Sequence, residues 1–392
     1  MGRRERQIAL EIAKEIERLP GAEQSERFFE LIRASEIPYV PVRHRENPRK
    51  LFVDSFEAIY ILARASLPLA VGLTMHQYML GALATFPIRK AIPLKSKRDK
   101  MLRDIEEHRL LLAVASFGDN LLGRDQRPES VTVRPEGTGW VATGRKAFNS
   151  LAPVGDLLAF TADTQEGELG FFIVPLRGNP ALKPGPAVFP DAMADTHTCS
   201  LTFDALRLAR SNLLCLETEP TLEVLTFATA WFQALIAGAY LGAASRALEE
   251  VRRFAASVHT ADGNPLLELD GLILDVGRLA VRLQACVRMA HQFAEVIAIV
   301  KAENLGFVAD QVIEELIDFA SQIKYLSTQV AEEVVSASRR LIGTRAMAPT
   351  HPVNRLSGQI VFGPLHPLVS AQIERDAGRK ALRGVFLGLP GP

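Results

Sequence analysis

Apolar residues recur at helical spacing through the first hundred positions. Ile8, Ile12 and Ile16 lie on one face of a predicted helix. A more apolar stretch covers residues 61–88 and is interrupted by polar residues and by Pro68. A membrane-spanning helix needs about 20 almost uninterrupted apolar residues. We therefore expect buried helices with a break near Pro68, and no membrane span.

The pattern changes in the middle of the chain. Apolar and polar residues alternate in Ser130–Arg134 and again in Cys199–Leu208, as is typical of half-buried strands. The cluster Pro135–Gly139 has the composition of a turn, and Trp140–Thr143 resumes the strand pattern. Because no helical segment separates these strands, the pattern predicts a compact antiparallel β unit.

After residue 215 the spacing is helical again. Four long helical patterns follow, at Thr221–Ala256, Pro265–Lys301, Phe307–Ile342 and Val369–Arg383. Helices of this length can pack as a four-helix bundle. The sequence thus predicts an α+β fold: an N-terminal helical domain over residues 1–108, a middle antiparallel β domain over 109–215 and a C-terminal four-helix bundle over 216–392.

Composition limits the kinds of partner. Lys and Arg together number 45, as do Asp and Glu, so no bulk charge favours nucleic acid or an anionic membrane. The three cysteines Cys199, Cys215 and Cys286 form no disulfide or metal-binding pattern, and a reducing, cytoplasmic location is expected. The eight histidines have no metal-ligand spacing, and the phosphate-loop, zinc-protease and serine-hydrolase motifs are missing. We expect a small-molecule ligand and no metal.

Four segments in the right order resemble the acyl-CoA dehydrogenase superfamily. The clearest is Thr143–Ala162 (TGRKAFNSLAPVGDLLAFTA), and Gly170–Leu176 and Thr198–Leu214 resemble the strands that follow it. Leu112–Asn120 (LAVASFGDN) stands where the family has its Thr-Glu-Pro…Gly-Ser-Asp loop, although the Thr-Glu-Pro part is absent here. The resemblance covers nearly the whole chain and implies a flavoprotein oxidoreductase with FAD as its cofactor.

The resemblance implies a set of flavin contacts. An isoalloxazine ring needs an apolar wall and a few hydrogen-bonding groups at its polar edge. Phe148 is the candidate wall, and Asn149, Ser150 and Ser116 are candidates for the polar edge. The alternative is that Phe148 is a core aromatic residue and Asn149-Ser150 an ordinary turn.

Three further positions are compared with the family: two depart from its residues and one belongs to a segment that resembles it. His259 stands where the family has an arginine that reaches the flavin pyrophosphate of a neighbouring subunit, and a partly charged imidazole should hold it more weakly. Gly343 belongs to the segment that resembles the family's glycine turn against the flavin. Thr350 occupies the position of the catalytic glutamate of many acyl-CoA dehydrogenases, and a threonine hydroxyl is no general base at neutral pH.

His366 supports a different activity on the same fold. Pro364–Leu382 resembles the end of flavin-dependent monooxygenases, which carry an acid/base histidine beside the flavin. An imidazole with a pKa near 6.5 would suit that role. The alternative is an ordinary loop histidine between Pro364 and Pro367.

Three hypotheses therefore stay open. The first is an FAD-dependent dehydrogenase acting on an acyl-CoA or a related small molecule, with electrons leaving through an electron-transfer flavoprotein. The second is a monooxygenase using His366, FAD or FMN from a flavin reductase, and a biosynthetic intermediate as its substrate. The third is a non-catalytic subunit of a hetero-oligomer. The resemblance also implies a homodimer or homotetramer.

Overall fold

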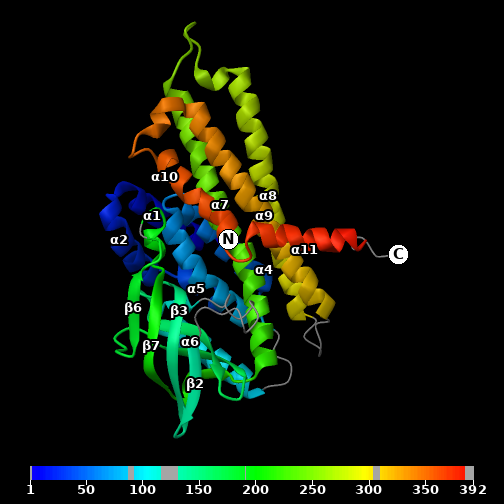
Figure 1. Ribbon diagram of the computed structural model, residues 1–392. Helices are drawn as coiled ribbons and strands as arrows, with labels where there is room; N and C mark the ends of the chain where they lie inside the picture. The colour runs from blue at the N-terminus through cyan, green and yellow to red at the C-terminus, as the bar shows by residue number, and fades with distance from the viewer. Residues whose placement is uncertain (1, 87–91, 116–130, 190, 303–309, 385–392) are drawn as a thin grey trace.

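The computed structural model describes residues 2–86, 92–115, 131–189, 191–302 and 310–384. Helices form the N-terminal part, a sheet the middle and long helices the C-terminal part (Figure 1). The N-terminal helices are α1 (Arg3–Arg18), α2 (Gly21–Ala34), α3 (Val40–Arg43), α4 (Pro48–Ala63), α5 (Leu67–Thr85) and α6 (Ile92–Glu107). The α+β fold class predicted from the sequence is confirmed.

The break predicted near Pro68 separates α4 from α5. Proline is tolerated in the first turn of a helix, where its missing N–H has no partner to lose. Pro68 occupies that position in α5, and α4 ends at Ala63. Almost every residue of α5 is buried, so this apolar helix forms the centre of the N-terminal part.

In the described residues of the middle region, eight strands form one sheet. These are β1 (Leu112–Ala115), β2 (Val131–Glu136), β3 (Gly139–Ser150), β4 (Leu157–Thr164), β5 (Leu169–Pro175), β6 (Leu182–Ala187), β7 (Cys199–Leu208) and β8 (Leu213–Cys215). The main path runs β6-β7-β3-β1-β4-β5-β8, and β2 pairs with β3 and β4. Most pairs are antiparallel as expected, but β4 pairs in parallel with β1 and β2, because the chain returns through β3 before it enters β4.

Three long α-helices and two shorter ones lie in the described part of the C-terminal region. They are α7 (Thr218–Ser257), α8 (Asp270–Ala302), α9 (Asp310–Ile342), α10 (Pro352–Gln359) and α11 (Ser370–Leu382). Helices α7, α8 and α9 lie lengthwise together, whereas α11 crosses them (Figure 1). The fourth predicted bundle helix is therefore a short crossing helix, and α4 and α5 pack on α7 instead.

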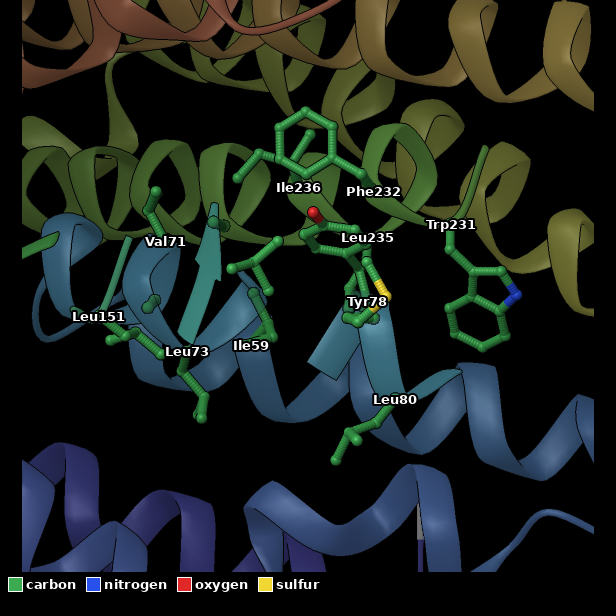
Figure 2. Packing of buried hydrophobic residues seen from close by; sticks show 14 of the residues in the cluster. Ile59, Val71, Leu73, Tyr78, Leu80, Leu151, Trp231, Phe232, Leu235 and Ile236 are labelled. Atoms are coloured by element: carbon green, nitrogen blue, oxygen red, sulfur yellow. The ribbon is translucent and has the colours of Figure 1, made fainter. Parts of the chain in front are cut away.

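Helix α7 joins the helical parts of the molecule. Its most apolar 18-residue window is 89% buried, as in the core helix of a globular domain. Trp231 of α7 packs edge-on against Phe52 and Phe293 and donates its indole N–H to Thr85 at 3.0 Å. Figure 2 shows α7 residues facing α5 residues such as Tyr78 and Leu80 across this core. The packing fixes α7 against α5, on which the candidate site depends.

Candidate functional site

The predicted flavin contacts on β3 lie at the end of that strand. Phe148 exposes 46% of its surface, although it is a large aromatic residue. Asn149 is buried, and its amide nitrogen donates to the carbonyls of Lys146 and Cys199 at 2.9 Å each. Asn149 therefore ties β3 to β7, and the exposed Phe148 is the residue that offers a flat apolar surface.

Ser150 begins a short chain of hydroxyl groups. Its Oγ lies 3.0 Å from Thr198 Oγ1, which lies 2.9 Å from Thr196 Oγ1. Thr196 in turn donates to the carbonyl of Met193 at 2.9 Å. Because that carbonyl can only accept, Thr196 donates to it, Thr198 donates to Thr196, and Ser150 donates to Thr198. The Ser150 oxygen can therefore still accept a hydrogen bond from a ligand, and its role at the polar edge of a ring stays a prediction.

Aromatic rings connect Phe148 to the C-terminal region. Phe148 lies 6.1 Å from Phe189, and Phe189 lies 5.5 Å from Phe362, measured between ring centroids. Phe362 belongs to η8 (Ile360–Leu365), a short 3-10 helix that follows α10. Phe189 therefore connects the end of β3 to the segment that carries His366.

The predicted catalytic residue His366 follows η8 and lies against α7. Its Nε2 is 2.8 Å from the hydroxyl of Tyr240, and its ring is 6.0 Å from the ring of Phe232. Phe232 in turn lies 5.3 Å from Tyr78 of α5. The Tyr78 hydroxyl makes no hydrogen bond to any residue that the structure describes, and its oxygen points toward Phe232 in Figure 2. We call the set Phe148, Phe189, Phe362, His366, Phe232, Tyr240 and Tyr78 the aromatic site.

The environment changes the chemistry expected of His366. Burial, with a smaller contribution from the nearby Lys324 ammonium, lowers the pKa of His366 to about 3. The sequence-based expectation of an ordinary imidazole pKa near 6.5 is therefore wrong, because both causes disfavour the imidazolium. At neutral pH the ring is neutral, and a Tyr240 hydroxyl that donates to Nε2 places the ring proton on Nδ1. Nδ1 has no hydrogen-bond partner among the described residues.

The other predicted site residues lie apart from this cluster or outside the described residues. Ser116 lies outside them, although β1 ends at Ala115, opposite Asn149. Thr350 is exposed in the turn before α10, and Gly343 ends α9 with φ +74°. His259 is exposed in the turn between α7 and α8, where its backbone pairs with Pro265. Among the described residues, Phe148, Asn149 and Ser150 lie together at the end of β3, and Phe189 and Phe362 connect Phe148 to the segment that carries His366.

Sequence reasoning missed the residues that surround His366. Tyr240 and Phe232 belong to the apolar stripe of α7, and Lys324 is a fully buried lysine on α9. A lysine among apolar and small residues was a usable signal, because lysine is almost never fully buried without a reason. Tyr240 and Phe232 gave no local signal, since aromatic residues are ordinary in a core helix.

His76 has a structural role. Its Nδ1 accepts a hydrogen bond from the backbone N–H of Leu112 at 2.9 Å, which ties α5 to the first residue of β1. Burial lowers the pKa of His76 to about 4. Protonation of Nδ1 would remove the acceptor, so this contact requires a neutral ring.

The pH dependence of stability should show the role of His76. Between pH 6.5 and 4 an unfolded histidine binds a proton that the folded state resists, so the free energy of unfolding falls as pH is lowered through this window. We expect a loss of about 2–3 kcal/mol from His76, measured as urea midpoints at pH 7.5 and 4.5. In His76→Gln the difference between the two pH values should shrink. An unchanged difference would show that His76 is not a source of the acid sensitivity.

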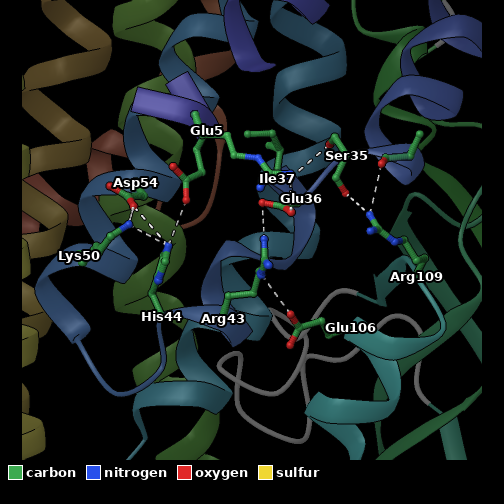
Figure 3. Close-up of polar contacts among 12 residues, drawn as sticks. Glu5, Ser35, Glu36, Ile37, Arg43, His44, Lys50, Asp54, Glu106 and Arg109 are labelled. Atoms are coloured by element: carbon green, nitrogen blue, oxygen red, sulfur yellow. Dashed lines mark hydrogen bonds and ion pairs between the residues drawn. The ribbon is translucent and has the colours of Figure 1, made fainter. Parts of the chain in front are cut away.

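A cluster of possible metal ligands lies elsewhere, between α1, α3 and α4. Glu5, His44 and Asp54 bring one ligand atom each within 4.8 Å of the others. The ammonium of Lys50 occupies this cluster: it donates to Asp54 and lies 2.8 Å from His44 Nε2 (Figure 3). Lysine therefore supplies the positive charge that balances these carboxylates.

A cavity lies beside α10. This cavity of about 510 Å³ is bounded by the α4–α5 turn, α7, α10 and the residues around Asp191. Its lining includes Arg64 and Arg355 as well as Asp191 and Asp195, so its charges balance. It contains none of the aromatic-site residues.

Comparison with known proteins agrees with this architecture. Residues 234–370 match the family model described as "Acyl-CoA dehydrogenase, C-terminal domain". This segment includes most of α7 and extends through His366. The search of curated proteins found no significant match.

Solved structures align over almost the whole chain. FMN-bound TdsC, a dibenzothiophene monooxygenase from Paenibacillus sp. A11-2, is 20% identical and aligns with a TM-score of 0.83 over 99% of each chain. The methanesulfinate monooxygenase MsuC from Pseudomonas fluorescens is 18% identical, with a TM-score of 0.77 over 99% of this chain and 98% of its own. The prolyl acyl carrier protein oxidase AnaB is 14% identical, with a TM-score of 0.75 over 99% of this chain and 100% of its own. The chain thus has the acyl-CoA dehydrogenase-like fold, and residues 234–370 match the model of that family's C-terminal domain.

Proposed function

We propose that the protein is a flavin-dependent monooxygenase that oxidises a small aromatic substrate beside His366. The observation that carries the proposal is the placement of His366. Its neutral imidazole lies on Tyr240 and Phe232, and its segment is connected to Phe148 through Phe362 and Phe189. The solved enzymes with the same fold include two monooxygenases. The coarser description, a flavin oxidoreductase, is supported by all three.

The residues of the aromatic site fit a flavin ring. Phe148 exposes a flat apolar face, and Ser150 offers an oxygen that can accept a hydrogen bond. An apolar wall with a few placed polar groups is what such a ring requires. FMN is the cofactor that we favour, since TdsC is solved with FMN and with indole. FAD is the alternative.

Reduced flavin would supply the two electrons that convert O₂ and substrate into oxidised substrate and water. The chain's own groups would position the substrate and hold a proton beside it. The neutral His366 can donate a hydrogen bond from Nδ1 while the Tyr240 hydroxyl donates to Nε2. Phe232 and Tyr78 give the site apolar walls and exclude water. In this arrangement His366 would assist oxygen transfer by hydrogen bonding. A flavin reductase would be the partner protein that supplies reduced flavin.

The dehydrogenase hypothesis has less support. Thr350 replaces the glutamate that would take the α-proton, and its side chain is exposed in a turn. Among the described residues, no carboxylate forms a hydrogen bond or ion pair with His366. A non-catalytic role is not favoured either, because the aromatic site keeps a histidine with defined partners.

Incorporation of oxygen from O₂ tests the proposal. With FMN, an NADH-driven flavin reductase and indole as the first aromatic probe, ¹⁸O₂ should place one ¹⁸O atom in the product, detected by mass spectrometry. A panel of aromatic heterocycles and sulfides extends the probe set. Desaturation of an acyl-CoA under anaerobic conditions, with no ¹⁸O in any product, would overturn the proposal in favour of a dehydrogenase.

We also propose that a second copy of the chain covers α8. The most apolar window of this helix is only 39% buried, and Leu274 and Val281 each expose 68% of their surface. Leu274, Val281 and Ile299 repeat at intervals that place them on one helical face. Exposed apolar stripes of this kind usually mark an interface.

Sedimentation velocity tests this association. The wild-type chain should sediment as a dimer or tetramer of its 43.0 kDa protomer, and Val281→Glu should shift it toward the monomer because a buried carboxylate without a partner is costly. Leu382→Glu, on a side chain that is 91% exposed on α11, should leave the assembly unchanged. A monomeric wild-type protein would contradict this proposal.

A further inference from the structure

The segment that carries His366 is attached to α9 by a single buried lysine. The ammonium of Lys324 donates to the carbonyls of Pro364, His366 and Leu368 at 3.2, 3.0 and 2.8 Å. An ammonium group has three N–H donors. Each donor of Lys324 therefore has one acceptor, and all three acceptors belong to residues 364–368.

The same segment is held from a second side by close packing. A Cβ atom placed on Gly363 would lie 2.9 Å from a methyl group of Thr328 on α9 and 3.0 Å from the Tyr240 ring on α7. The backbone of Gly363 therefore fits directly between α7 and α9. Together, Gly363 and Lys324 leave the side chain of His366 facing Tyr240 and Phe232.

A buried lysine is energetically unfavourable at this position of α9. The Lys324 side chain is fully buried, and none of the described carboxylates forms an ion pair with it. Burial lowers the pKa of Lys324 to about 8, which means that the folded protein disfavours the charge even with three hydrogen bonds. A methionine would fill an apolar position of α9 without that cost. The lysine is thus better explained by what it does to the segment 364–368.

We propose that Lys324 is a positioning residue for His366: its three hydrogen bonds hold residues 364–368 in the conformation that lays the imidazole on Tyr240 and Phe232. The inference rests on the proposed function in one respect: it takes His366 to be the group that acts on the substrate. The charged and titratable groups that face His366 are Lys324 from α9 and Tyr240 from α7. The lysine charge has a second effect on the same ring, because it opposes formation of the imidazolium.

Carbethoxylation of histidines by diethyl pyrocarbonate measures this positioning without flavin or substrate. The rate for each histidine of the full-length protein is followed by peptide mass spectrometry. In Lys324→Met we expect the rate at His366 to rise at least fivefold relative to the exposed His259 and His108, because the ring is released from Tyr240. Lys380→Met is the matched control. Lys380 links α11 to Asp318 of α9 and does not contact residues 364–368, so its removal should change the ratio less than twofold.

Turnover gives the functional half of the test. With FMN and a substrate that the wild type oxygenates, Lys324→Met should lower kcat at least tenfold while the FMN Kd and the substrate KM change less than threefold. A folded Lys324→Met protein with an unchanged His366 rate or an unchanged kcat would overturn the inference. Because carbethoxylation needs no turnover, a wild type without oxygenase activity would refute the proposed function and leave the histidine result interpretable.

A pH series on the wild type keeps the inference testable if Lys324→Met does not fold. As pH passes about 8 the Lys324 ammonium loses a proton and one of its three donors. His366 is already neutral at pH 7, so its rate, divided by the rate of the neutral fraction of free Nα-acetylhistidine, should then rise between pH 7 and 9. A flat ratio over this range would overturn the inference.

Discussion

Alanine in place of His366 is expected to lower kcat for oxygenation at least about a hundredfold, the size of effect typical of a residue that moves or holds a proton in the rate-limiting step. His366 is the one group that joins the C-terminal segment to Tyr240 by a side-chain hydrogen bond among the described residues. Its Nδ1 has no partner there and is therefore free to act on a ligand. Steady-state kinetics with flavin supplied by a reductase measure kcat for the variant and the wild type.

A split between kcat and binding separates this role from a structural one. The Kd of oxidised FMN should stay within threefold in His366→Ala, because the proposed ring wall is Phe148 and not the histidine. His351→Ser is the matched control: His351 caps α10 by accepting from Val353 N–H, and serine can replace that cap. Loss of kcat in both variants would point to a general disturbance of the C-terminal segment, and an active His366→Ala would rule out the assigned role.

Phe148→Asp is expected to weaken FMN binding about 10- to 100-fold. Burying one face of a phenyl ring against a flavin contributes about 1.5–3 kcal/mol, and each 1.4 kcal/mol is about tenfold in Kd. Phe148 is 46% exposed, so the substitution removes little core packing, and aspartate adds a charge that repels the anionic FMN. Quenching of FMN fluorescence during titration measures the Kd.

The stability of the variant serves as an internal check. Because Phe148 contacts only Phe189 among described aromatic rings, the melting temperature should fall by a few degrees at most. Leu382→Asp, at an apolar side chain that is 91% exposed on α11, should leave the FMN Kd unchanged. A Phe148→Asp protein that binds FMN within twofold of wild type would place the flavin elsewhere.

The order of the elements could be predicted from the sequence because each follows from local periodicity. Helical spacing located α7, α8 and α9 to within a few residues of Thr218–Ser257, Asp270–Ala302 and Asp310–Ile342. Pro68 marked the start of α5 because its ring fits only the first helical turn. The parallel pairing of β4 could not be predicted, since strand order depends on how distant segments pack.

The surroundings of His366 could not be predicted for the same reason. Tyr240 lies 126 residues away and Lys324 42 residues away along the chain, and only the packing of α7 against α9 brings them to the imidazole. The pKa of His366 depends on that burial, so the sequence alone supported only the value of a free imidazole. Phe148 and Ser150 were predicted as contacts by resemblance, and they stay predictions until a flavin is seen beside them.

A structure determined with FMN bound is the most direct measurement of the central claim, that the end of β3 and the segment after η8 enclose the flavin ring. We expect the ring in van der Waals contact with Phe148, within about 4 Å, with the His366 side chain facing the same ring. A ring bound in the cavity beside α10, or one separated from Phe148 and His366 by other side chains, would contradict it.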